Sequence, residues 1–132
     1  FNCLIGNGDA HLKNFSIMYD IDRENIVMTP PYDITHTLIY PTIDNKLALK
    51  MDDSKAFPDY KTLRKFGESF GIKKCSEIIE KTAASISDYI NNSAEISIME
   101  GLKESIERSL AQAKTGTFSR TGYRHDKHRK FE

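Results

Sequence analysis

The sequence predicts a mainly α-helical fold with one small β-hairpin near its start, and two observations lead to this class. Residues 14–28 contain two short segments rich in β-forming residues, with turn-forming residues between them. From residue 57 onward, apolar residues recur every three or four positions, which is the spacing of one face of a helix. The change of period near Phe57 therefore divides the chain into an irregular, strand-containing first part and a helical second part.

The hairpin is predicted from about Phe15 to Met28. Residues 14–19 alternate in polarity, residues 20–25 supply Asp and Asn for a turn, and residues 26–28 resume the strand pattern. The two prolines that follow end the second strand, because proline cannot donate a hydrogen bond to a sheet. Residues 46–51 also alternate in polarity, and we expect a short third strand there.

Three amphipathic helices are expected after the hairpin. The first begins near Pro58, which suits a first turn, and ends at Gly71. Its apolar face is formed by Phe57, Tyr60, Leu63, Phe66 and Phe70. The second runs from about residue 76 to 90, with Ile79, Ala83, Ile86 and Ile90 on one stripe. The third is capped by Ser93 and runs to about residue 114, with Met99, Leu102, Ile106, Leu110 and Ala113 facing inward. Such helices pack as a small antiparallel group.

Bulk properties fit one ordinary globular domain. The 132 residues are 39% hydrophobic and 29% charged, and 19 basic residues balance 19 acidic ones, which argues against a basic field over the whole domain. The two cysteines, Cys3 and Cys75, have no partner at metal-ligand spacing and suit a reducing compartment, so we expect a cytoplasmic protein. No apolar run reaches the ~20 residues that a membrane helix needs, and the apolar start lacks the basic region of a signal peptide.

The last part of the chain, residues 118–132, differs from the domain predicted over residues 1–117. It has five Lys or Arg residues, two acidic residues, two histidines and little apolar content. Such a segment has too little apolar surface to offset the entropy of ordering, so we expect a disordered basic tail. The alternative is a basic arm that contacts DNA or an acidic partner.

The segment with the most chemical information is Gly6–Ser16. Asp9 follows Asn-Gly in a tight loop, Asn14 lies five residues later, and Asp33 follows the hairpin after two prolines and a tyrosine. Phosphoryl transfer by protein kinases uses a carboxylate at the acceptor hydroxyl, an Asn five residues later on a metal ion, and a second Asp after a hairpin. Asn14 and Asp33 offer the oxygen ligands that Mg²⁺ prefers.

The run N-G-D-x-H-x-K-N-F-S, followed by a hairpin and P-x-Y-D, resembles the HipA family of serine/threonine kinases. The resemblance is dense from Leu4 to Thr37 and thin beyond. It implies a kinase-like C-terminal lobe that uses ATP and Mg²⁺, with Asp9 as the catalytic base and Asn14 and Asp33 as metal ligands. It also implies nucleotide contacts by His11, Lys13, Asn14, Tyr32 and Asp33, and it suggests substrate contact by Thr35, His36 and Thr37.

The glycine-rich loop and strand lysine of kinases do not occur in this sequence, and the resemblance implies that an N-terminal lobe supplies them. The whole protein would then be a toxin that phosphorylates an aminoacyl-tRNA synthetase and is restrained by a DNA-binding antitoxin. On this basis Asp9, Asn14 and Asp33 should converge on one concave face, with Asn14 and Asp33 close enough to share a metal ion.

Other interpretations remain open from the residues alone. Asp9 and Asp33 could be only turn residues, Asn14 could satisfy loop backbone, Lys13 could be a solvated charge, and His11 could brace the loop. The residues after Asp33 could form an ordinary loop. At the level of the protein, the alternatives are a non-catalytic helical module that docks an antitoxin or DNA, and a metal-dependent phosphohydrolase that uses Asp9 and Asp33.

Overall fold

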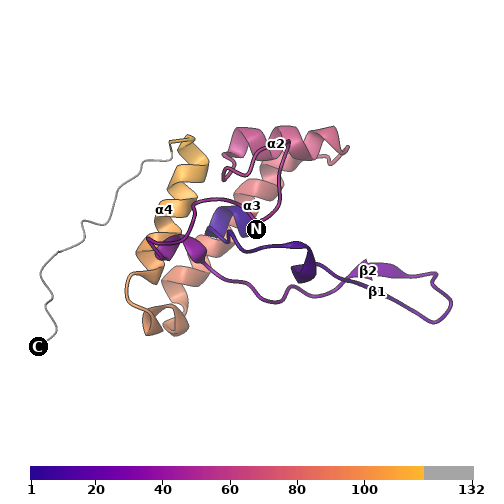
Figure 1. Ribbon diagram of the computed structural model, residues 1–132, viewed down its shortest axis with the longest axis horizontal. Coiled ribbons are helices and arrows are strands. Elements are labelled where there is room, and N and C mark those ends of the chain that lie inside the picture. The colour runs from indigo at the N-terminus through magenta and orange to yellow at the C-terminus, as the bar shows by residue number, and fades with distance from the viewer. Residues whose placement is uncertain (118–132) are drawn as a thin grey trace, which may run out of the picture.

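The computed structural model describes residues 1–117, and the predicted basic tail at 118–132 lies outside the described residues. Figure 1 shows a group of helices from which a long hairpin projects. In chain order the elements are α1 (Asn2–Ile5), η1 (Leu12–Asn14), β1 (Ile17–Tyr19), β2 (Ile26–Met28), η2 (Thr37–Ile39), α2 (Tyr60–Ser69), α3 (Cys75–Asn92), η3 (Ala94–Ile98) and α4 (Leu102–Thr115), where η marks a 3₁₀ turn. The predicted class, mainly α with one small hairpin, is confirmed.

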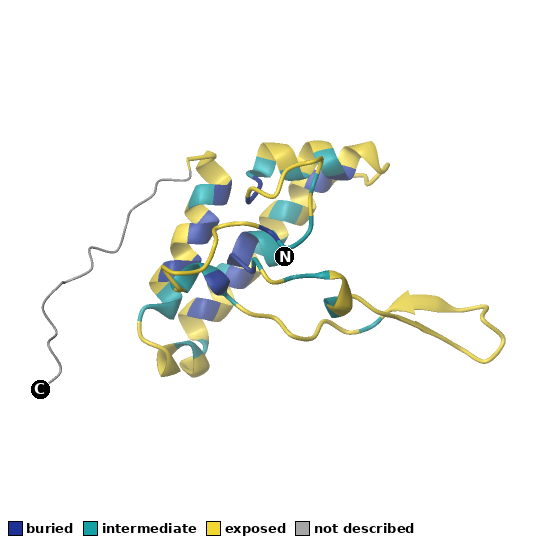
Figure 2. Cartoon of the chain, viewed as in Figure 1, coloured by how far each residue is buried: buried dark blue, intermediate teal, exposed yellow. Residues whose placement is uncertain are grey.

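The hydrophobic core lies where α1, α3 and α4 meet. Its buried members are Leu4, Ile5, Ile86, Ile90, Ile106, Leu110 and Ala113. Figure 2 shows the buried positions gathered on the facing sides of these helices. The single turn of α1 therefore lies inside the helical group, and the loop that follows it starts from a rigid base. Helix α1 was not predicted from the sequence, because one turn is too short to show a period.

The hairpin forms as predicted but packs on nothing in the described part of the chain. Its strands are antiparallel, with Ile17 opposite Met28 and Tyr19 opposite Ile26. All six strand residues are exposed. The turn is organised by Asp20, whose carboxylate accepts hydrogen bonds from the Glu24 amide at 2.9 Å and the Asn25 side chain at 2.6 Å. Local turn chemistry and β-propensity therefore account for this element, without burial of either face.

The first predicted helix is shorter at its start than expected. Helix α2 begins at Tyr60, and the Asp59 carboxylate caps it by accepting a hydrogen bond from the Thr62 amide at 2.7 Å. Phe57 and Pro58 are buried ahead of the helix. Phe70 is 71% exposed, so its predicted place on the inner face is wrong. It comes after the last helical residue, where the chain has already turned away from the core.

The third predicted helix is interrupted near its start. Ser93 does cap, by accepting from the Glu95 amide at 3.3 Å, but it caps the 3₁₀ turn η3. The chain then reaches Gly101, whose φ of +77° belongs to the left-handed region, and α4 begins only at Leu102. Met99 falls in the connection between the two elements and is 37% exposed, so it is not a core residue as predicted.

The predicted third strand at 46–51 is wrong. Among the described residues, this stretch makes only one isolated bridge, between Met51 and Ser54. Leu47 is buried, and its amide donates to the Lys55 carbonyl at 2.7 Å, so the segment is a compact loop that inserts one apolar side chain. Within residues 1–117, no helix has the length and apolar character to cross a membrane. Both cysteines are free thiols, and Cys75 is buried.

Candidate active site

The loop Gly6–Asp9 leaves α1 in a conformation that requires its two glycines. Gly6 has φ of +77°, and a Cβ there would lie 2.8 Å from the Leu38 side chain. Gly8 is needed because the backbone of the 46–51 loop approaches it closely, and not because of a positive φ. A Cβ added at this position would lie 2.6 Å from the Lys46 carbonyl oxygen. The loop is therefore pressed against the segment that follows the hairpin and against the 46–51 loop.

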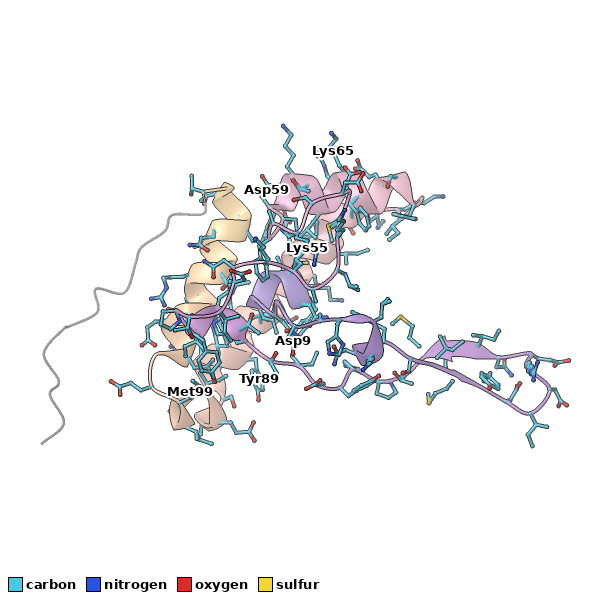
Figure 3. The ribbon with its side chains drawn as sticks, viewed as in Figure 1. Asp9, Lys55, Asp59, Lys65, Tyr89 and Met99 are labelled. Carbon is cyan, nitrogen blue, oxygen red and sulfur yellow. The ribbon has the colours of Figure 1, made fainter. Side chains whose placement is uncertain are left out.

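Asp9 comes at the end of this loop, and its side chain is exposed. Figure 3 labels it below α1, on the loop that leads toward the hairpin. Its backbone is held at both ends, since its amide donates to Asn7 Oδ1 at 3.0 Å and its carbonyl accepts from the His11 amide at 2.8 Å. The carboxylate borders a groove of about 1060 Å³ that is open to solvent. A hydroxyl group of another molecule can therefore reach it.

The groove beside Asp9 is mainly apolar. Apart from Asp9, its walls come from Phe1 and Ile5, from residues 34–37 and Tyr40, and from the facing sides of α3, η3 and α4. Tyr89 and Met99, labelled in Figure 3, lie at its α3 and η3 side. Lys81 is the basic residue among these walls.

Asn14 and Asp33 are brought into direct contact, although 19 residues separate them. Asn14 Nδ2 donates to Asp33 Oδ2 at 2.6 Å, and Asn14 Oδ1 accepts from the His11 amide at 2.9 Å. The turn η1 presents Asn14, and the hairpin returns the chain so that Asp33 lies opposite. Asp33 has φ of +53°, a left-handed conformation that Asp tolerates better than most residues. The two side chains are in contact, but through the Asn14 nitrogen, whereas the prediction concerned two oxygens that share a metal ion.

A pocket of about 270 Å³ surrounds this pair. Its walls include Asn2, Asn7, Ala10, Asn14, Phe15, Tyr32 and Asp33. Asp9 borders the neighbouring groove rather than this pocket, and Ile34 contributes to both. The predicted convergence of all three residues on one concave face is therefore not seen: the Asn14–Asp33 pair lines one hollow, Asp9 lines another, and the two hollows share Ile34.

The other three predicted nucleotide contacts lie around the same pair. The Tyr32 hydroxyl bonds to the Lys13 carbonyl and lies 2.9 Å from Ser16 Oγ, so it ties the segment after the hairpin to the end of η1. The Lys13 side chain is exposed to solvent. His11 is half-buried, and its Nδ1 is a buried atom with no hydrogen-bond partner among the described residues.

The donor atoms fit a hard divalent cation such as Mg²⁺. Asn14 and Asp33 both line the pocket and carry oxygens of the kind that Mg²⁺ binds. Here the Asn14 amide turns Nδ2 toward Asp33 and Oδ1 toward the His11 amide, so the amide would have to turn over for both oxygens to face one ion. Among residues 1–117, no cluster of three or more His, Cys, Asp or Glu side chains is arranged to hold a metal. Mg²⁺ commonly takes only one or two protein carboxylates and completes its shell with water and phosphate oxygens. The pair therefore suits a metal that arrives with a phosphate ligand better than an all-protein site.

Several residues of the site were not identified from the sequence. Asn7 is 1% exposed, and its side chain contacts α1, Asp9 and Thr35. Thr37 is buried, with its hydroxyl accepting from the Gly8 amide at 2.8 Å, and His36 bonds to α1 and α4. Thr37 and His36 thus hold parts of the site together through hydrogen bonds within the protein. The sequence had suggested substrate contact for them and had not indicated this structural role. An Asn before Gly-Asp is typical of a turn, and no local signal indicates its burial.

Comparison with known families identifies this arrangement. The profile of the HipA-like C-terminal domain matches residues 1–90, which is more than half of the chain. The chain belongs to the HipA-like C-terminal domain family. The match covers α1, the hairpin and most of α3, and so includes Asp9, Asn14 and Asp33, whereas the η3 and α4 walls of the groove lie beyond it.

Two curated relatives come from Sinorhizobium fredii. The chain is 28% identical to "Putative kinase Y4mE" over an alignment of 106 residues that covers 74% of this chain and 25% of that protein. It is 42% identical to "Putative kinase Y4dM" over 55 residues, which are 42% of this chain and 13% of that protein. The chain thus spans a quarter or less of each relative's length. No solved structure matches it. Both relatives are named as kinases, and the family of this chain is kinase-related.

Proposed function

We propose that this HipA-like chain is the C-terminal catalytic lobe of an ATP- and Mg²⁺-dependent protein serine/threonine kinase. The observation that carries the proposal is the contact of Asn14 with Asp33 at 2.6 Å, beside the loop that presents an exposed Asp9. These are the positions at which a kinase needs its metal ligands and its base. Nothing in a turn-forming role alone requires residues 19 positions apart to meet in one pocket.

In this proposal the residues divide the work of the transfer. Asp9 accepts a hydrogen bond from the acceptor hydroxyl, orients it, and takes its proton late in a loose transition state. Asn14 and Asp33 would hold Mg²⁺ after the Asn14 amide turns to present Oδ1 in place of Nδ2, and the bound ion would neutralise charge on the phosphate oxygens. His11, Lys13 and Tyr32 lie beside the nucleotide phosphates. Tyr32 also stiffens the site through its bond to the Lys13 carbonyl.

The proposed partners follow from the same assignment. An N-terminal lobe supplies the glycine-rich loop and strand lysine that grip ATP. The acceptor is a Ser or Thr hydroxyl of another protein, for which an aminoacyl-tRNA synthetase is our candidate. The whole protein acts as a cytoplasmic toxin restrained by a DNA-binding antitoxin, and the basic residues at 118–132 are a candidate DNA contact.

The decisive experiment compares Asp9→Asn and Asp33→Asn in the full natural gene product. Asp9→Asn should lower phosphoryl transfer at least about 10²-fold while ATP affinity stays nearly unchanged, because the base meets the acceptor and not the nucleotide. Asp33→Asn should weaken Mg²⁺-dependent ATP binding as well as turnover, because it removes a charged ligand. The measurements are labelled-phosphate transfer to protein and ATP affinity with and without Mg²⁺.

Asp44→Asn is the matched control, since Asp44 is an exposed loop carboxylate outside both hollows, and it should leave transfer and affinity unchanged. Transfer by Asp9→Asn within a few-fold of the parent would show that Asp9 is not the base. Release of free phosphate without a protein acceptor would instead favour a phosphohydrolase. Full antitoxin or DNA binding by a protein that never transfers phosphate would favour the docking module.

A further inference from the structure

The loop that carries Asp9 is joined to the segment that carries Asp33 by one buried side chain. Asn7 Oδ1 accepts two hydrogen bonds, one from the Asp9 amide at 3.0 Å and one from the Thr35 hydroxyl at 3.0 Å. Thr35 lies two residues after Asp33. We call these two hydrogen bonds the Asn7 bridge. A single atom thus links the backbone of Asp9 to the segment that follows Asp33.

The Asn7 side chain is itself held in place. It is 1% exposed, and its Nδ2 donates to Asn2 Oδ1 on α1 at 2.9 Å. Because α1 is part of the hydrophobic core, the amide cannot rotate without losing a buried hydrogen bond. The direction of the amide is set by its partners, since a backbone N–H and a hydroxyl donate to the oxygen and leave the nitrogen for Asn2.

The same two segments are also joined next to the bridge. The Gly8 amide donates to Thr37 Oγ1 at 2.8 Å, and the Thr37 amide donates to the Gly6 carbonyl at 3.1 Å. These bonds fix the backbone of the Gly6–Gly8 loop, but they end one residue before Asp9. The Asn7 bridge is the contact that reaches the Asp9 backbone from the metal-ligand segment.

We propose that Asn7 is a positioning residue, which sets the place of the Asp9 carboxylate relative to Asp33 through the Asn7 bridge. The inference rests on the proposed function for its catalytic meaning. Outer residues that orient the groups of a site, and displacements of about 1 Å, change activity by about 10- to 100-fold. Asn7 lines the pocket of the Asn14–Asp33 pair, but its Oδ1 and Nδ2 are both engaged by protein groups and are not free to bind a ligand. Its effect should therefore fall on turnover and not on nucleotide binding.

The test uses Asn7→Ala, Thr35→Val and the double variant in the full natural gene product. Asn7→Ala should lower kcat by about 10- to 100-fold, with KM for Mg-ATP within about threefold. Thr35→Val keeps the shape of the side chain but removes the donor, and it should lower kcat less. Thr35→Ser restores a hydroxyl and should recover most of the loss. The double variant should be no worse than Asn7→Ala, because both changes break one link.

Two further measurements separate positioning from general destabilisation. Ala113→Gly, a core change in α4 with no role in the bridge, should lower the unfolding midpoint while leaving kcat unchanged. Hydrogen exchange of the Asp9 amide should accelerate in Asn7→Ala and stay at the parent rate in Ala113→Gly, because only the former removes its acceptor.

The outcomes distinguish this inference from the proposed function. A parent protein that transfers no phosphate would overturn the kinase assignment, while the exchange measurement would still decide whether the Asn7 bridge exists. Unchanged exchange of the Asp9 amide in Asn7→Ala would overturn the bridge. Normal kcat in Asn7→Ala, a multiplicative loss in the double variant, or a change in KM alone would overturn the positioning role.

Discussion

At the scale of single residues, His36 shows how a side chain of this loop acts as a structural link. Its Nδ1 bonds to the Ile5 carbonyl on α1, and its Nε2 lies 2.7 Å from Ser105 Oγ on α4. Burial lowers the pKa of His36 below the usual 6.5, the bond to the Ile5 carbonyl opposes this shift, and repulsion from Arg108 adds to it. The imidazole is therefore bound in its neutral form.

The stability of the fold should depend on pH through His36. The pKa of His36 is lower in the folded chain than in the unfolded chain, so the unfolded chain takes up the proton first as the pH falls. The stability that is present above pH 6.5 is therefore lost as the pH approaches the folded pKa. We expect the thermal unfolding midpoint of the parent to decrease as the pH is lowered from about 7 to about 5. His36→Gln should flatten that part of the profile. A variant with the same pH dependence as the parent would assign the effect to other groups.

The residues with proposed chemical roles were easier to find than those that hold them. Asp9, Asn14 and Asp33 belong to a spacing pattern that protein kinases share, so the sequence alone indicated them. Asn7 and Thr37 are buried polar residues that bond across 28 residues or more. Their environment depends on how the segment after the hairpin packs on α1. The residues next to them in the sequence give no indication of this packing.

At the scale of elements, the sequence predicted which helices and strands exist better than it predicted where each one begins and ends. The hairpin and the second helix followed from β-propensity and helical period, which are local properties. The start of α4 did not, because Ser93 caps the turn η3 and the chain then leaves helical geometry at Met99, which is extended, and at Gly101, which is left-handed. The exposure of both hairpin faces was likewise not predictable from the alternation of its residues.

The start of α2 depends on one capping side chain. The Asp59 carboxylate accepts hydrogen bonds from Thr62, and these interactions hold the pKa of Asp59 below its usual value. Asp59→Ala should lower the free energy of unfolding by about 1 kcal/mol, because the first turn loses its acceptor. Thermal or urea unfolding measures the change. Lys65→Ala, at an exposed position in the same helix, serves as the control and should change stability by less than about 0.5 kcal/mol.

At the scale of the whole molecule, one core of α1, α3 and α4 supports the site. Leu4 and Ile5 are among its most buried members, and the Asp9 loop starts at the next residue. Figures 1 and 2 together show the buried residues at this junction and the hairpin extending away from it. The loop that carries Asp9 is therefore anchored on the same core that holds the helices together.

Leu110→Ala tests this core directly. Leu110 is 9% exposed, and truncation of a buried leucine costs about 2–5 kcal/mol of unfolding free energy. We expect a large fall in the unfolding midpoint. Ile98→Ala removes a similar number of carbons from a side chain that is 85% exposed, and should cost less than about 0.5 kcal/mol. Similar losses for both variants would mean that α4 does not form the core described.

Propensity, period and motif spacing depend on residues close together in the chain, so the helical class, the hairpin and the resemblance that names Asp9, Asn14 and Asp33 could be predicted without a structure. The contact of Asn14 with Asp33, the burial of Asn7 between the two segments and the loop at residues 46–51 became visible only in the folded chain. Those features depend on which distant backbone groups face one another once apolar surface is buried. A hydrogen bond across 28 residues exists only after the core of α1, α3 and α4 has brought its two ends together.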